Sequence, residues 1–155
     1  MSARVARQPD RESWPDCVSE RADLFAVAHL AVAMVGETIM GATKDLAPMI
    51  HRQRLVIEGY PAFAITDDHI KDYRTQLSEV TEMEVLLLPV THCSDKYGWA
   101  GWIHWETSGA HFYAWEKPLL FFSVDIYTCK AFDPDDAARF TREYFKCTDQ
   151  IHREF

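Results

Sequence analysis

Four side chains able to transfer protons or act as nucleophiles stand close together in the second half of the chain. Ser108 precedes a glycine in a dipeptide typical of turns, and its hydroxyl can act as a nucleophile beside a base. His111 and Tyr113 are two residues apart, so in a strand they share one face. Cys129 carries a thiol that can give up a proton. These four side chains suit acid–base or nucleophilic chemistry. The alternative without a functional role is that Ser108 is only a hairpin residue and Cys129 only a small buried side chain.

These side chains require neighbouring strands to position them. Apolar runs and alternation predict strands over 84–90, 99–106, 110–116 and 119–129, with a turn over 94–98. In the last strand, one face is predicted to carry Leu120, Phe122, Val124 and Ile126, and the other Phe121, Ser123, Asp125, Tyr127 and Cys129.

Two helices are predicted beside these strands. One begins after Thr66 and buries Ile70, Tyr73, Leu77 and Val80; the other begins at Asp133-Pro134 and buries Ala137, Phe140, Tyr144 and Cys147. The fold class is therefore α+β: a two-layer sandwich of a mostly antiparallel sheet with helices on one face. Aromatic residues on the other face predict that a second copy covers it.

The middle of the chain resembles a known family. A Gly-x-x-Gly start at Gly98, a serine in a turn at Ser108, a tryptophan at Trp115 and the strand Val124-Asp-x-x-Thr-Cys129 together resemble the prokaryotic S-adenosylmethionine decarboxylases. The resemblance implies a zymogen that cleaves itself between Thr107 and Ser108 and converts the serine into a pyruvoyl group, the cofactor. The substrate amine forms a Schiff base with that group.

The resemblance also implies roles for other residues. Cys129 is the expected acid that returns a proton after decarboxylation, with His111 and Tyr113 as catalytic candidates in processing. The expected substrate-binding residues are Trp115, which can stack on a flat ring, and Glu116, Glu106 and Asp125. The family implies a homodimer with sites near the interface, S-adenosylmethionine as substrate, and a place in spermidine biosynthesis.

Several positions depart from the family pattern. A serine is expected where Ala100 stands, a glutamate where Thr107 stands, a histidine where Gly109 stands, and a second histidine where Tyr113 stands. A tyrosine hydroxyl is a poorer base than imidazole at neutral pH, so His111 is the proposed replacement. A glutamate expected on the first strand, taken as His29-Leu-Ala-Val-Ala33, is Ala33 here.

Composition limits the partners. The net charge of −8 argues against nucleic acid, and no apolar run reaches the roughly 18 residues of a membrane span, so we expect a cytoplasmic protein that binds a small molecule. The four cysteines show neither zinc-finger nor disulfide spacing. No metal is expected; the alternative is zinc bound by three of His92, Cys93, His104, Glu106 and His111.

The predicted organisation is a flexible extension over residues 1–22 and one S-adenosylmethionine decarboxylase-like domain over 23–155, with 37–65 as an insertion lacking a family counterpart. Two alternatives to S-adenosylmethionine decarboxylation stay open. One is a pyruvoyl enzyme acting on a basic amino acid such as ornithine or arginine. The other is an uncleaved homologue that binds S-adenosylmethionine or a related ligand as a regulatory subunit or for different chemistry.

Overall fold

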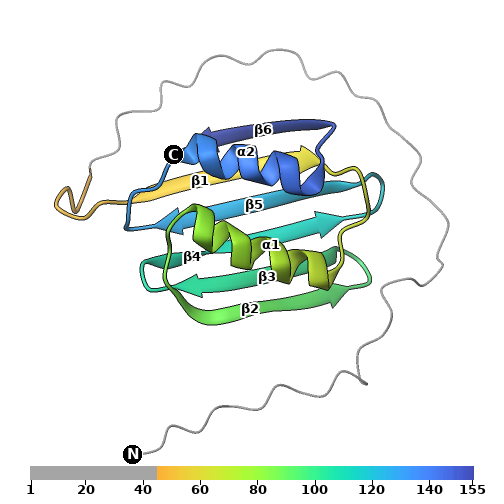
Figure 1. The fold of residues 1–155 in the computed structure, drawn as a ribbon, viewed down its shortest axis with the longest axis horizontal. Coiled ribbons are helices and arrows are strands. Elements are labelled where there is room, and N and C mark those ends of the chain that lie inside the picture. The colour runs from red at the N-terminus through yellow and green to blue at the C-terminus, as the bar shows by residue number, and fades with distance from the viewer. Residues whose placement is uncertain (1–44) are drawn as a thin grey trace, which may run out of the picture.

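In the part of the chain that the structure describes, a six-stranded sheet carries two helices on one face (Figure 1). This computed structural model describes residues 45–155. The predictions for the 1–22 extension and for a first strand at 29–33 lie outside the described residues. Within 45–155 no helix is long and apolar enough to cross a membrane.

Every strand pair in the sheet is antiparallel. The strand order is β2-β3-β4-β5-β1-β6. The strands are β1 (Gln53–Tyr60), β2 (Val85–Ser94), β3 (Gly98–Trp105), β4 (Ser108–Trp115), β5 (Phe121–Thr128) and β6 (Asp149–Glu154). The central strands β3, β4 and β5 follow one another in sequence and are joined by short turns, so residues from 98 to 128 form one continuous meander.

The alternation predicted for residues 119–129 is confirmed. In β5, Phe122, Val124 and Ile126 are buried, whereas the residues between them are partly or fully exposed. The β4 strand repeats the pattern with Ala110, Phe112 and Ala114 buried. Both strands therefore turn one face toward the helices, and the other, here called the open face, is covered by neither of the two described helices.

The two helices cover the buried face and close the core. Helix α1 (Asp67–Val80) begins at Thr66, whose hydroxyl accepts a hydrogen bond from the His69 N–H, and α2 (Pro134–Phe145) begins at Asp133 in the same way. Tyr73 of α1 meets the ring of Phe112 of β4 edge-on, and Phe145 of α2 contacts the same ring at a tilt, so Phe112 joins both layers. The predicted two-layer α+β sandwich is therefore confirmed.

Three expectations need correction. Val80 is 38% exposed, and the buried positions of α1 include Arg74 and Ser78 instead, because the helix packs along a face rotated from the predicted one. Strands β1 and β6 were not predicted. Cys93 is disulfide-bonded, although its spacing predicted no disulfide; Cys129 and Cys147 are free thiols.

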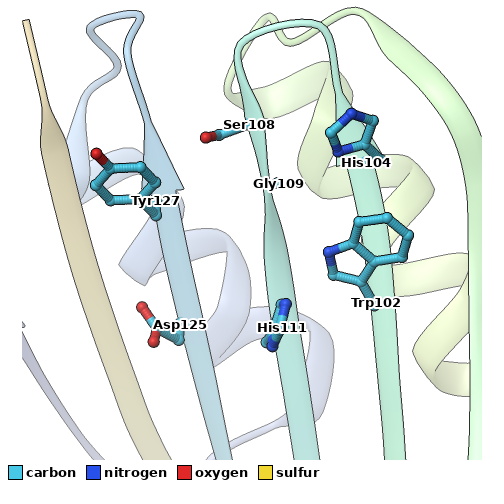
Figure 2. A pocket seen from close by; sticks show the side chains of 7 residues that line it. All are labelled: Trp102, His104, Ser108, Gly109, His111, Asp125 and Tyr127. Atoms are coloured by element: carbon cyan, nitrogen blue, oxygen red, sulfur yellow. The ribbon is translucent and has the colours of Figure 1, made fainter.

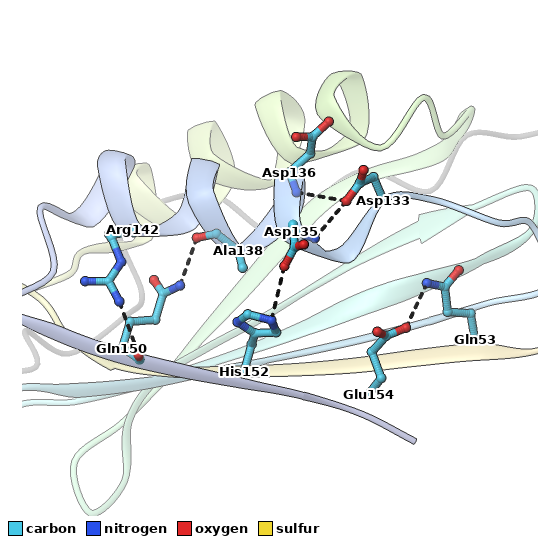
Figure 3. A network of polar contacts seen from close by, with 9 residues as sticks. All are labelled: Gln53, Asp133, Asp135, Asp136, Ala138, Arg142, Gln150, His152 and Glu154. Atoms are coloured by element: carbon cyan, nitrogen blue, oxygen red, sulfur yellow. Dashed lines mark hydrogen bonds and ion pairs between the residues drawn. The ribbon is translucent and has the colours of Figure 1, made fainter.

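Polar contacts fix β6 against α2 (Figure 3). Gln150 donates to the Ala138 carbonyl at 2.8 Å, and Arg142 donates to the Gln150 carbonyl at 3.2 Å. His152 Nε2 lies 3.5 Å from the Asp135 carboxylate. These contacts hold a mostly polar strand that buries little apolar surface of its own.

Candidate active site

A hollow of about 270 Å³ lies on the open face, over strands β3, β4 and β5 (Figure 2). Its walls are Trp102, His104, Ser108, Gly109, His111, Asp125 and Tyr127. The structure thus brings together three of the predicted site residues: Ser108, His111 and Asp125. They come from two adjacent strands whose register pairs His111 with Asp125.

Ser108 has an unusual backbone. It is the first residue of β4, directly after the two-residue turn that follows Trp105, its partner on β3. Its φ is +142°, a region that side chains other than glycine rarely adopt and that costs about 1–3 kcal/mol. Successive strand residues normally face opposite ways, yet Ser108 lines the same hollow as Gly109 (Figure 2). The strained backbone is what turns the hydroxyl away from ordinary strand geometry.

The carbonyl immediately before Ser108 is held by two donors from one residue. The Cys129 backbone N–H donates to the Thr107 oxygen at 3.0 Å, and the Cys129 thiol donates to the same oxygen at 3.2 Å. Two convergent donors stabilise negative charge that develops on a carbonyl oxygen during attack. The two donors also polarise the Thr107 carbonyl.

His111 is one of two histidines that line the hollow, the other being His104. Its Nδ1 lies 3.4 Å from the Tyr113 hydroxyl, and its ring meets the Trp102 ring edge-on. Partial loss of hydration lowers the pKa of His111, the positive charge of Arg74 lowers it further, and Asp125 opposes both. A lowered pKa keeps the imidazole neutral, and able to accept a proton, at neutral pH.

Asp125 is ion-paired across β5 and β1. Arg54 binds the carboxylate with both Nε and Nη2, at 2.9 and 2.7 Å. The hydrogen bond to Asp125 raises the pKa of Arg54. The Arg54 side chain therefore stands beside the hollow. Arg54 was not predicted as a site residue, because residues 37–65 were interpreted as an insertion.

Two departures from the family pattern are neighbours. Ala100 of β3 pairs directly with Tyr113 of β4, so a small residue stands opposite a large one. A third departure has a steric cause: a Cβ on Gly109 would lie 2.3 Å from the Ile103 carbonyl oxygen. The histidine expected after the serine therefore cannot fit unless the β3–β4 turn shifts.

The remaining predicted residues lie elsewhere. Trp115 is at the far end of β4 from Ser108 and lines a second hollow of about 310 Å³ with Tyr60, Lys117, Pro118, Leu119 and Phe121. Glu116 follows it and is exposed, and Glu106 is an exposed turn residue whose N–H donates to the Glu84 carbonyl. Among residues 45–155, no three His, Cys, Asp or Glu side chains gather in a group that could hold a metal ion.

Comparisons with known proteins identify the class to which this helix-backed antiparallel sheet belongs. The S-adenosylmethionine decarboxylase family model matches residues 54–155, and the chain belongs to that family. None of the curated proteins matches the sequence significantly.

The fold agrees with this assignment. The crystal structure of the adenosylmethionine decarboxylase from Aquifex aeolicus VF5 superposes with a TM-score of 0.56 at 13% identity. The superposition covers 68% of this chain and 89% of that one. At this identity the likeness concerns the fold alone.

The family match bears on the predicted insertion over residues 37–65. Because the match begins at residue 54, β1 belongs to the family domain, and residues 54–65 are not part of an insertion. Glu58 lies on the open face of β1, between the buried residues Ile57 and Gly59. A carboxylate on the first strand is therefore present, at Glu58.

Proposed function

We propose that this protein is a pyruvoyl-dependent decarboxylase of S-adenosylmethionine that cleaves itself between Thr107 and Ser108. The observation that carries the proposal is the pairing of a strained Ser108 with a preceding carbonyl held by two Cys129 donors. Strain in the peptide unit is released on cleavage, and the donors stabilise the oxyanion that forms on the way.

The first step is an acyl shift. The Ser108 Oγ attacks the Thr107 carbonyl carbon, and the negative charge on oxygen is taken by the N–H and thiol of Cys129. The tetrahedral intermediate expels the Ser108 nitrogen, which takes up a proton, and leaves an ester between Thr107 and the serine oxygen. A neutral base is needed to accept the hydroxyl proton.

The second step is an elimination. A base removes the Ser108 Cα proton, the ester oxygen leaves with Thr107 as a carboxylate, and hydrolysis of the resulting enamine releases ammonia. His111 is the proposed base, since its lowered pKa keeps it neutral and it lines the same hollow. Tyr113, 3.4 Å from His111, can pass the proton on. The products are residues 1–107 and 108–155.

A pyruvoyl group at position 108 would supply the electron sink for decarboxylation. The residues present fit such a group, because position 108 opens into the hollow and Cys129 stands beside it as proton donor. Trp102 and Tyr127 offer aromatic faces to a substrate cation such as a sulfonium. Asp125 is already ion-paired with Arg54, so its negative charge is not available to bind the substrate cation.

We also propose that two copies pack open face to open face. Support comes from the aromatic residues that this face exposes, including Tyr60, Tyr113 and Tyr127, each more than 40% exposed. Ser108 and Trp115 stand at opposite ends of an extended strand, about 23 Å apart at ordinary strand rise. Trp115 and Glu116 therefore reach a Ser108 site only from the partner copy.

Carbon dioxide release tests the proposed substrate. Purified protein is incubated with carboxyl-labelled S-adenosylmethionine, ornithine or arginine, with Ser108→Ala as the control. Release from S-adenosylmethionine by the wild type alone supports the proposal. Release from ornithine or arginine would assign a simpler amino acid as substrate, and no release from any would favour an uncleaved ligand-binding homologue.

A further inference from the structure

A chain of side-chain hydrogen bonds leads into the residue before Ser108. The Lys130 N–H donates to Thr128 Oγ1 at 3.0 Å, and the Thr128 hydroxyl donates to Thr107 Oγ1 at 3.1 Å. The Thr107 hydroxyl in turn donates to the Met83 sulfur at 3.2 Å. Thr128 is fully buried and Met83 is 6% exposed, so the chain runs on the helix side of the sheet.

The end of this chain is itself fixed to the core. The Met83 N–H donates to the Ser78 carbonyl at 2.8 Å, at the end of α1. The Ser78 hydroxyl accepts a hydrogen bond of 2.7 Å from the buried Trp105 indole, which comes from β3. The Thr107 side chain is thus bonded directly to Thr128 of β5 and to Met83, whose backbone is in turn bonded to Ser78 of α1.

This attachment bears on the scissile bond. Thr107 is β-branched and has few side-chain rotamers, so holding its hydroxyl also fixes its Cα and the direction of its carbonyl. That carbonyl is the one directed at Cys129. The strain at Ser108 persists only if neighbouring contacts prevent the turn from relaxing, and the Thr107 side chain supplies such a contact from the opposite side of the sheet.

We propose that Thr107 is a positioning residue for self-cleavage, and that the Thr128–Thr107–Met83 chain of hydrogen bonds holds the scissile carbonyl against Cys129. The inference rests on the proposed function. The family resemblance implies a glutamate before the serine. Holding the carbonyl through a threonine hydroxyl therefore requires the threonine that this chain has at position 107. The reacting carbonyl belongs to the Thr107 backbone, and the Thr107 side chain acts only by orienting that carbonyl.

The experiment compares cleavage rates of matched variants of the full chain. Thr107→Val keeps the branched shape and loses the hydroxyl, Thr107→Ser keeps the hydroxyl, and Thr128→Val and Met83→Leu remove the neighbouring partners. Thr141→Val is the control, because Thr141, like Thr128, is a fully buried threonine, and it hydrogen-bonds Tyr73 in the core between the helices. Each variant is also unfolded in urea, so that a stability loss is measured separately.

We expect Thr107→Val and Thr128→Val to slow cleavage by about fivefold or more, the equivalent of one hydrogen bond. Thr107→Ser should cleave faster than Thr107→Val. Thr141→Val should lose stability but cleave at the wild-type rate. Added hydroxylamine captures the Thr107–Ser108 ester, and it should not rescue Thr107→Val if the acyl shift itself is slowed.

The outcomes separate the two proposals. A wild-type chain that never cleaves overturns the proposed function and this inference with it. A wild type that cleaves while Thr107→Val cleaves equally fast overturns only the positioning role. Full rescue by hydroxylamine also overturns it, because the acyl shift would then be intact. A rate loss in Thr141→Val as large as in Thr107→Val would show a general stability effect and overturn it too.

Discussion

Cys129 holds the Thr107 carbonyl through both its N–H and its thiol, at 3.0 and 3.2 Å, directly beside the strained Ser108. The backbone bond extends the β4–β5 ladder by one pair beyond Ser108 and Thr128. The thiol bond depends on the side chain. In the proposed mechanism, Cys129 therefore assists self-cleavage through both its backbone N–H and its thiol, and the same thiol later donates a proton during decarboxylation.

Replacing Cys129 with alanine should slow self-cleavage without abolishing it. The variant loses one donor to the Thr107 oxygen and keeps the backbone N–H, so we expect a loss of about tenfold to a hundredfold. Cys129→Ser should retain most of the cleavage rate, since a hydroxyl can donate in the same place. Timed mass spectrometry of fresh protein measures both rates. An alanine variant that cleaves at the wild-type rate would exclude a role for the thiol in processing.

Replacing Ser108 with glycine should stabilise the uncleaved protein relative to Ser108→Ala. Glycine adopts a φ of +142° without penalty, while alanine keeps the strain, and both block cleavage. We expect a difference in the free energy of unfolding of about 1 kcal/mol, after the added chain entropy of glycine is subtracted. Urea unfolding of both variants measures it. Equal stabilities would mean that position 108 is not strained.

The cleavage rate should depend on a neutral His111. Because loss of hydration lowers its pKa below the usual 6.5, the rate should stay constant at neutral pH and fall only at a midpoint below 6.5. The unfolded chain binds this proton at higher pH than the folded one, so folding stability should also decline as pH falls from about 6.5. His111→Asn should lose most of the rate and this part of the pH dependence. A rate midpoint above 6.5 would argue for another base.

Restoring two family residues together should accelerate cleavage. Ala100 and Tyr113 are direct cross-strand partners, so Ala100→Ser and Tyr113→His are expected to act as a pair with a non-additive effect. The double variant places a hydroxyl and an imidazole on the open face beside His111. Rates of both single variants and the double variant measure the coupling. Purely additive or absent gains would indicate that the two sites do not cooperate.

Local pattern was enough to predict the central strands and their faces. In β4 and β5 buried and exposed residues alternate, and the buried residues are apolar except for Thr128. The β1 strand was missed because Gly59 and Pro61 suggest a break, and β6 because its residues are mostly charged or polar. An edge strand such as β6 is held by hydrogen bonds to a neighbour, which the sequence does not reveal.

The site was predicted in part for the same reason. Shared strand faces predicted that His111 lies with Tyr113 and that Asp125 lies with Tyr127. Ser108 lines the same hollow as His111 because its backbone is strained, which alternation does not predict. The Arg54–Asp125 ion pair depends on the register between β1 and β5, and the bonds of Cys129 depend on the turn at Thr107. Tertiary register and backbone strain of this kind are not encoded in local spacing.

The intact mass of freshly purified protein, followed during incubation at neutral pH, tests the central claim most directly. The account predicts that the 17.9 kDa chain gives way to two fragments, residues 1–107 and residues 108–155, the latter beginning with a keto group and formed only when Ser108 is present. A single uncut chain that persists through prolonged incubation would contradict it.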